Sequence, residues 1–455
     1  MTKFNSFALR ALISRKLLIS VSLLIVSNAH SSSSGLLDFA GVTFAESNNE
    51  SGEFEGVLNL NYRLEKNLQN KKWQYHIEGQ FFGASYPEFA AAVPEARVFY
   101  TTKETEISIG RKKIEQLNFL DKDWNLGVQT AFFRMDPFNP KEQGLLGINY
   151  EIKTDQVFMD LFVSPLFVPD QNPSVSVRDS GLVEANSPWS FLPPQNIELS
   201  TGGVLGVDYS VTDDSLPELL NQHQFGGRFG IELKDLSILG MYYNRPSNQL
   251  GFDISAKVEA GETEGFVNVQ AKPQFLREHF YGLQAESVWI DKLKIKNGFY
   301  GIVQNKSETS TAKFQTARFD YFFIATSLEY KAKDFKLSLK HLLTNKRQIE
   351  EEEVVYFETD RFLFENALSL GVSDLTFKKV DFNFGSVYSY KQKVAQFHLR
   401  ASKKITKRLS FYTYFNMIND FGDGPVTSEN TELTPLGMGR YAALDNIRLG
   451  VTYAL

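Results

Sequence analysis

The sequence has 455 residues, with 54 acidic and 48 basic side chains, a formal net charge of −6 and no cysteine. The absence of cysteine excludes a disulfide framework and a thiolate metal site, and the acidic balance argues against a nucleic-acid-binding protein. Aromatic residues make up 14% of the chain, including 39 Phe and 19 Tyr. Both favour strands, and Tyr also favours membrane–water interfaces.

Residues 1–29 have the layout of a secretory signal peptide. A basic start without acids precedes the apolar run LLISVSLLIV, 17–26, and then the small residues Ser27 and Ala29. The run is too short for a stable transmembrane helix, which needs about 20 residues. We expect Sec-dependent export and cleavage; an uncleaved anchor or a buried helix is the alternative. Cleavage removes four cations and no acid (Lys3, Arg10, Arg15 and Lys16), so the net charge moves from −6 to −10.

Residues 30–53 are small and polar and are interpreted as a flexible leader. From Phe54 onwards apolar and polar residues alternate, as in a strand with two different faces. In one run Trp73, Tyr75 and Ile77 oppose Gln74, His76 and Glu78. These runs are about as long as a tilted membrane strand, which needs about 9–11 residues. The pattern predicts a single β-barrel over residues 54–455.

The connections between these runs differ in length. Short polar turns alternate with longer segments, which is typical of an outer-membrane barrel with short periplasmic turns and long extracellular loops. The predicted fold class is therefore all-β: one transmembrane antiparallel barrel of about 20 strands, within a range of 16–22, although residues 165–224 cannot be phased. Backbone groups in lipid must be paired within the protein, so the sheet must close. We expect the last strand to pair with the first, near Phe54.

The final eight residues, RLGVTYAL, alternate strictly between polar or small and apolar residues. Gly450, Tyr453 and Leu455 match the C-terminal assembly signal of bacterial outer-membrane barrels, except that the family has Phe in the final position. The chain thus resembles bacterial outer-membrane β-barrel proteins, and its size and strand rhythm resemble the large porin-like and alginate-export-like barrels. The resemblance implies the outer membrane of a Gram-negative cell, contact with its lipids, and recognition by the barrel assembly machinery through the C-terminal strand.

Motifs of known catalytic or cofactor sites are missing from the sequence. It contains no HExxH, G-x-S-x-G, Walker loop or GxGxxG, and its six histidines have no ligand spacing. His76 and His398 fall on the polar parity of strands and are interpreted as solvated lumen residues. We expect no enzymatic activity, no cofactor and no metal; a hydrolase site assembled from distant strands is the least favoured alternative.

The longest segment between predicted strands is 165–200, which is rich in proline. Long loops without secondary structure in compact proteins are often functional or disordered. We expect this loop to fold inward and narrow the pore, with charges of both signs at the constriction; an exposed cell-surface loop is the alternative. The predicted constriction residues are Asp170, Arg178, Asp179 and Glu184.

The polar parities carry both signs of charge, which favours a wetted, weakly selective pore. The sequence therefore predicts a porin-like channel for passive diffusion of small hydrophilic solutes. The alternative is a structural or surface-binding barrel with a closed lumen. Solute identity and oligomeric state are left open. The predicted lumen-lining residues are Arg63, Glu78, Glu151, Arg400 and Arg408.

Overall fold

The computed structural model describes residues 32–44, 55–67, 72–84, 89–114, 124, 129–134, 140–172, 175–178, 180–186, 190, 192–193, 195–198, 203–211, 221–260, 265–290, 292–305, 314–316, 318–349, 355–357, 364–421 and 445–454. The signal peptide prediction lies outside these residues. Among them no helix is long and apolar enough to cross a membrane.

The main sheet forms a ring in which each strand pairs antiparallel with the next and the last strand, β26, pairs with the first, β1. Among the described residues the ring has 18 members, an even number within the predicted range. They are β1 (Ser32–Phe44), β2 (Glu55–Asn67), β3 (Trp73–Ala84), β4 (Phe89–Thr101), β5 (Thr105–Lys112), β8 (Leu145–Lys153), β9 (Val157–Ser164), β14 (Gln224–Glu232), β15 (Leu236–Ala260), β16 (Gly265–Trp289), β17 (Leu293–Gln304), β19 (Arg318–Lys331), β20 (Lys336–Ile349), β22 (Ala367–Phe377), β23 (Val380–Ser389), β24 (Val394–Lys404), β25 (Leu409–Asp420) and β26 (Asn446–Ala454).

The first strand corrects one prediction. Residues 32–44, assigned above to a flexible leader, form β1, and the last strand pairs with it rather than near Phe54. Phe39 is exposed on the outside of the ring, whereas Ala40 and Val42 are buried. Small or apolar residues on both faces removed the polar alternation from the sequence, which is why the strand was missed.

Side chains alternate between the two surfaces of the ring. On β5 Ile107 and Ile109 are exposed on the outside, while Ser108 between them is buried. On the neighbouring β8 Ile148 and Tyr150 are likewise exposed, and Asn149 is fully buried. Exposed apolar side chains on the outside of the described strands require a hydrocarbon environment, and the pairing of every ring strand on both edges satisfies the backbone there.

The two ends of the ring differ. At one end consecutive strands are joined by short turns, such as Lys378 and Lys379 between β22 and β23. At the other end the connections include the long segments 113–144, 165–223 and 421–445. Both described chain ends lie at the short-turn end, because Leu36 of β1 is opposite Ala454 of β26.

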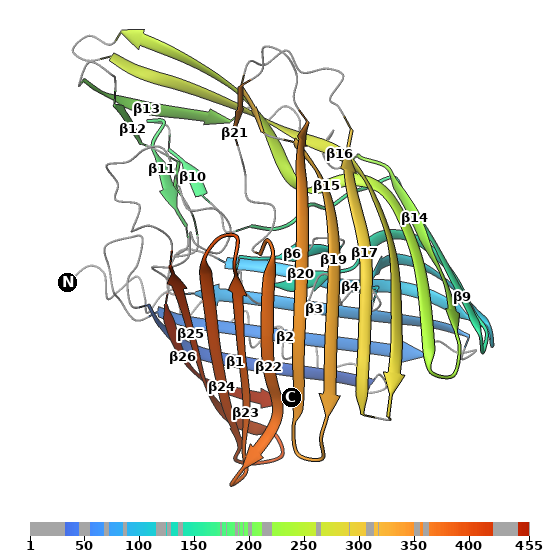
Figure 1. Cartoon of the computed structure of the whole chain (residues 1–455). Helices are drawn as coiled ribbons and strands as arrows, with labels where there is room; N and C mark the ends of the chain where they lie inside the picture. Colours follow the sequence, from blue (N-terminus) through green and yellow to red (C-terminus); the bar gives the residue numbers. More distant parts are fainter. Residues whose placement is uncertain are drawn as a thin grey trace.

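Two strands continue well past the ring. β15 and β16 have 25 residues each, about twice the membrane requirement. Their outer parts pair with β13 (Val204–Val211) and β18 (Phe314–Thr316), which in turn pair with β12 (Asn196–Glu198) and β21 (Val355–Phe357). Figure 1 shows this outer sheet beyond the rim, together with the hairpin of β10 (Val175–Val177) and β11 (Val183–Ala185). β10 to β13 do not enter the ring, which explains why segment 165–224 could not be phased.

Candidate functional site

Of the connection between β5 and β8, residues 113–114, 124, 129–134 and 140–144 are described, and they lie inside the ring. They include a hairpin of β6 (Thr130–Phe132) and β7 (Lys141–Gln143). Phe132 packs on Phe82 of β3 and on Ala90 and Ala92 of β4. Phe82 has the parity of the buried Gln80, whose register partner is Ala92. The start of the segment is fastened to the hairpin, because the Ile114 N–H donates to Gln129 Oε1 at 2.8 Å.

The hairpin is attached to the wall at β15. Asn248, next to an irregularity in the β15–β16 pairing, donates from Nδ2 to the carbonyl of Gln129 at 2.8 Å. Arg245 donates to Asn248 Oδ1 at 2.7 Å and forms a 2.9 Å ion pair with Glu278. From the other side the Ala131 N–H donates to Asp170 Oδ1 at 2.7 Å. Segment 113–144 is therefore held by the wall and by the start of segment 165–200.

Trp124, which belongs to the same connection, lies on the opposite side of the lumen. Its side chain is fully buried and packs edge-on against Phe364, with ring centroids 6.3 Å apart. Phe364 lies three residues before Ala367, the first residue of β22. From β5 the ring runs through β8, β9, β14, β15, β16, β17, β19 and β20 to β22, which is nine pairings, or half of the 18. We refer to the described residues of 113–144 as the crossing segment.

Paired charges cover the inner face of β3, β4, β5 and β8. Arg97 pairs with Glu95 at 2.8 Å and also with Glu106. Lys112 bridges Glu106 at 3.0 Å and Glu151 at 2.7 Å. Most of these side chains are only partly buried. We call this surface the charged wall; it consists of His76, Glu78, Glu95, Arg97, Glu106, Lys112, Lys113 and Glu151.

Further round the ring the inner face becomes aromatic. Tyr243 packs against Phe280 with centroids 6.4 Å apart, and Phe280 stacks on Tyr300 at 6.1 Å. Gly282 and Gly298 flank the ring of Tyr300 so closely that a Cβ at either position would clash with it. We call this surface the aromatic wall; it consists of Tyr243, Phe280, Tyr300, Phe319, Tyr321 and Phe323, all buried in one cluster with Trp124 and Phe364.

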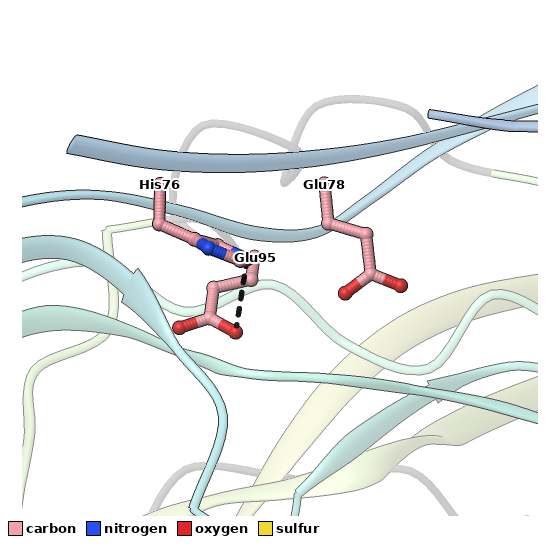
Figure 2. A group of neighbouring side chains, drawn as sticks. All are labelled: His76, Glu78 and Glu95. Carbon is pink, nitrogen blue, oxygen red and sulfur yellow. Dashed lines mark ion pairs between the residues drawn. The ribbon is translucent and has the colours of Figure 1, made fainter. Parts of the chain in front are cut away.

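A histidine and two carboxylates meet on the charged wall. His76 and Glu78 lie two residues apart on β3, on one face, and Glu95 lies on β4, where it is the register partner of Glu78. Candidate ligand atoms of all three lie within 4.8 Å of one another, and Figure 2 shows His76 facing Glu95 with Glu78 beside them. His76 is buried, so its interpretation as a solvated residue was wrong.

The predicted lumen residues fall in different places. Glu78 and Glu151 belong to the charged wall, and Arg400 of β24 lies over the ring of Tyr412 at 4.9 Å. Arg63 is opposite Glu78 in the β2–β3 register, but its side chain lies outside the described residues. Arg408 corrects the prediction: it is exposed in the short turn before β25, because it precedes the strand rather than belonging to it.

The four predicted constriction residues are not brought together. Asp170 holds the crossing segment, as described above. Arg178 and Glu184 pair with each other on the exposed β10–β11 hairpin, and Asp179 lies outside the described residues. The constriction prediction is therefore corrected only in part: Asp170 lies against the crossing segment, whereas Arg178 and Glu184 stand on the outer hairpin and do not join it. The greater length of segment 165–200 therefore did not show which residues lie inside the ring.

One contact near the closure of the ring, where the last strand pairs with the first, was not predicted. Tyr412 of β25 donates to Asp38 of β1 at 2.9 Å, reaching over β26. Gly450 of β26 makes room, since a Cβ there would lie 2.3 Å from the Tyr412 ring. Gly450 and Tyr453 were predicted as assembly-signal residues; Tyr453 is exposed on the outside, and Leu455 lies outside the described residues. Asp38 had no signal because its strand was assigned to the leader.

Neither a protein-family model nor a curated protein matches the sequence. Among solved structures the chain is similar to OccK11 (OpdR) of Pseudomonas aeruginosa, with 11% identity, a TM-score of 0.47 and coverage of 93% of this chain and 96% of that chain. It is similar to OccAB1 of Acinetobacter baumannii with 9% identity, a TM-score of 0.47 and the same coverage. For OmpT, an outer membrane protein of Vibrio cholerae, the values are 9%, 0.41, 93% and 97%.

The chain resembles bacterial outer-membrane β-barrels, and its own strand pairing defines that fold. The similarities to individual structures are too distant to carry functional information, so the geometry of the lumen has to supply it.

Proposed function

We propose that the protein is an outer-membrane channel through which small hydrophilic solutes diffuse passively. The observation that carries the proposal is the opposite character of the two surfaces: apolar outside, and ionised and paired on the charged wall inside. Side chains of Glu78, Lys113 and Glu151 keep between a quarter and a third of their surface accessible. Ionised groups that retain this much accessible surface indicate a wetted lumen, because a dry one would penalise each charge.

The crossing segment supplies the constriction of this channel. It leaves the charged wall at Lys113 and reaches the far side of the lumen at Trp124. Solutes therefore have to pass between the charged wall and the segment. Pairing of both signs along that wall favours weak ion selectivity. Passive diffusion requires no chemical step, so we assign the protein no catalytic role and no cofactor.

Liposome swelling with sugars of graded size tests the proposal. We expect uptake that falls as sugar size increases, and faster uptake for Trp124→Ala, since removal of the indole opens the constriction. Trp73→Ala is the matched control, because Trp73 lies exposed on the outer face of β3. The control should leave the size limit unchanged.

A second candidate function is a barrel with a closed lumen that serves as a structural or surface-binding protein. The observation that favours it is the fully buried contact of Trp124 with Phe364, which joins the crossing segment to the opposite side. Absence of size-dependent uptake by the unmodified protein, together with its appearance in Trp124→Ala, would support this second function over the first.

A further inference from the structure

We propose that His76, Glu78 and Glu95 form a binding site for a divalent transition-metal ion, of which Zn²⁺ is the model, on the charged wall. The site is independent of transport, because binding requires the folded barrel but no flux through it. No motif in the sequence predicts it.

The geometry of the three side chains suits a small cation. The antiparallel pairing of β3 and β4 brings Glu95 opposite Glu78, while His76 follows two residues away on the same face. His76 Nε2 lies 3.6 Å from Glu95 Oε2, close to the separation of about 3.4 Å between two ligands of a tetrahedral Zn²⁺ with bonds of about 2.0–2.2 Å. Glu78 completes the group after a small side-chain movement, leaving a fourth position for water.

The neighbouring cations occupy only part of each carboxylate. Arg97 Nε donates to Glu95 Oε1, at 2.8 Å, whereas His76 faces Oε2. Lys113 Nζ contacts Glu78 Oε2 at 2.5 Å, so the bond uses one of the two oxygens. Groups that hydrogen-bond to the outer oxygen of a ligating carboxylate are a common support of metal sites. Arg97 can keep this position because Glu106 also neutralises it.

Lys113 competes with the metal ion for the carboxylate of Glu78. Its ammonium neutralises Glu78 in the metal-free state, and its positive charge lowers the affinity for a cation nearby. We therefore expect moderate affinity in the unmodified protein and tighter binding when this charge is removed.

The donor set indicates the class of metal. An imidazole together with carboxylates suits Zn²⁺, Ni²⁺, Cu²⁺ or Co²⁺, whereas Ca²⁺ and Mg²⁺ take oxygen ligands only and in larger number. The chain has no cysteine, so thiolates do not compete. Ca²⁺ and Mg²⁺ should accordingly fail to displace Zn²⁺.

The experiment is isothermal titration of Zn²⁺ into the tag-free, detergent-folded barrel, with folding of each variant verified by its electrophoretic heat-modifiability. We expect one ion per chain, a loss of affinity of about ten-fold or more in His76→Gln and in Glu95→Gln, and a gain of about ten-fold in Lys113→Met. Glu151→Gln is the matched control, because Glu151 lies on the same wall with similar exposure but outside the site; it should bind as the unmodified protein does.

Co²⁺ provides a second readout. Visible absorption of a four-coordinate ion should appear in the unmodified protein, strengthen in Lys113→Met and vanish in His76→Gln. Unchanged Zn²⁺ affinity in His76→Gln, or no gain in a folded Lys113→Met, would overturn the site. Either result would leave the channel proposal standing, since sugar uptake is measured without metal.

Discussion

The charged wall and the aromatic wall line the same lumen but differ in how far their side chains are exposed. Lys112 and Glu151 of the charged wall form an ion pair whose acidic side chain remains 27% exposed. Phe280, Tyr300 and Phe323 of the aromatic wall are completely buried. One wall faces water, and the other packs in one cluster with the tip of the crossing segment. The difference teaches that the interior of this barrel is not uniformly wet, although both walls have exposed apolar side chains such as Ile109 and Phe322 on the outer face of their strands.

The largest expected effect comes from breaking a buried ion pair next to the charged wall. Asp160 of β9 and Arg228 of β14 form an ion pair at 2.7 Å, with side chains 0% and 2% exposed. Asp160→Ala should lower the free energy of unfolding by about 3–5 kcal/mol, because a guanidinium is left buried without its partner. Glu151→Ala, which breaks a partly exposed pair, should cost less than about 1 kcal/mol. Urea unfolding in lipid vesicles measures both; equal costs would show that the two pairs share one environment.

The aromatic wall should respond through packing rather than charge. Phe323 of β19 stacks on Tyr321 with centroids 5.9 Å apart and has no exposed surface. Phe323→Ala should cost about 3–4 kcal/mol through the cavity it leaves. The control is Phe322→Ala, on the outer face of the same strand, which should cost less because its side chain is partly exposed. The same unfolding assay applies. A larger loss of unfolding free energy in Phe322→Ala than in Phe323→Ala would mean that Phe322, and not Phe323, faces the interior.

The seam between the first and last strands should show an intermediate effect. Tyr412→Phe removes the hydrogen bond to the Asp38 carboxylate, and bonds to charged groups contribute about 1.5–3 kcal/mol. Tyr388→Phe is a control, since Tyr388 is exposed on the outer face of β23. A loss confined to Tyr412→Phe would confirm that β25 and β1 are linked across β26; equal values for the two variants would contradict it.

Much of this arrangement followed from residue alternation. Alternation with a period of two residues correctly indicated strands such as β3 and β8 and the closed antiparallel fold. It also indicated that Glu78 and Glu151 lie on a polar face. Alternation fails as a signal where the inward-facing residues are not polar. The inward-facing Ala40 and Val42 are the reason that β1 was not predicted, and the inward aromatic residues Tyr243 and Phe323 cannot be told from outward ones in the sequence.

Contacts between distant segments were beyond such reasoning. The packing of Trp124 against Phe364, the anchoring of the crossing segment to Asn248, and the approach of Glu95 to His76 depend on strand order and register. No local pattern encodes them, so the position of residues 129–134 inside the ring was not predicted.

The smallest expected effect lies in the turn between β22 and β23. Lys378 and Lys379 have φ values of 50° and 65°, a left-handed conformation that favours Asn and Gly in two-residue hairpins. The double substitution Lys378→Asn and Lys379→Gly should stabilise the barrel by about 1 kcal/mol. The turn lies away from both walls, so sugar uptake should not change; altered uptake would mean that the turn contributes to the pore.

The most direct test of the central claim uses the absence of cysteine in the chain. Single variants Glu151→Cys and Ile109→Cys place a thiol on the inner and outer faces of the adjacent strands β8 and β5. In lipid vesicles the first should react with a small water-soluble maleimide and the second should be protected, while a lipid-borne quencher should affect only a probe at position 109. Rapid reaction at position 109 with protection at position 151 would contradict an apolar exterior around a wetted lumen.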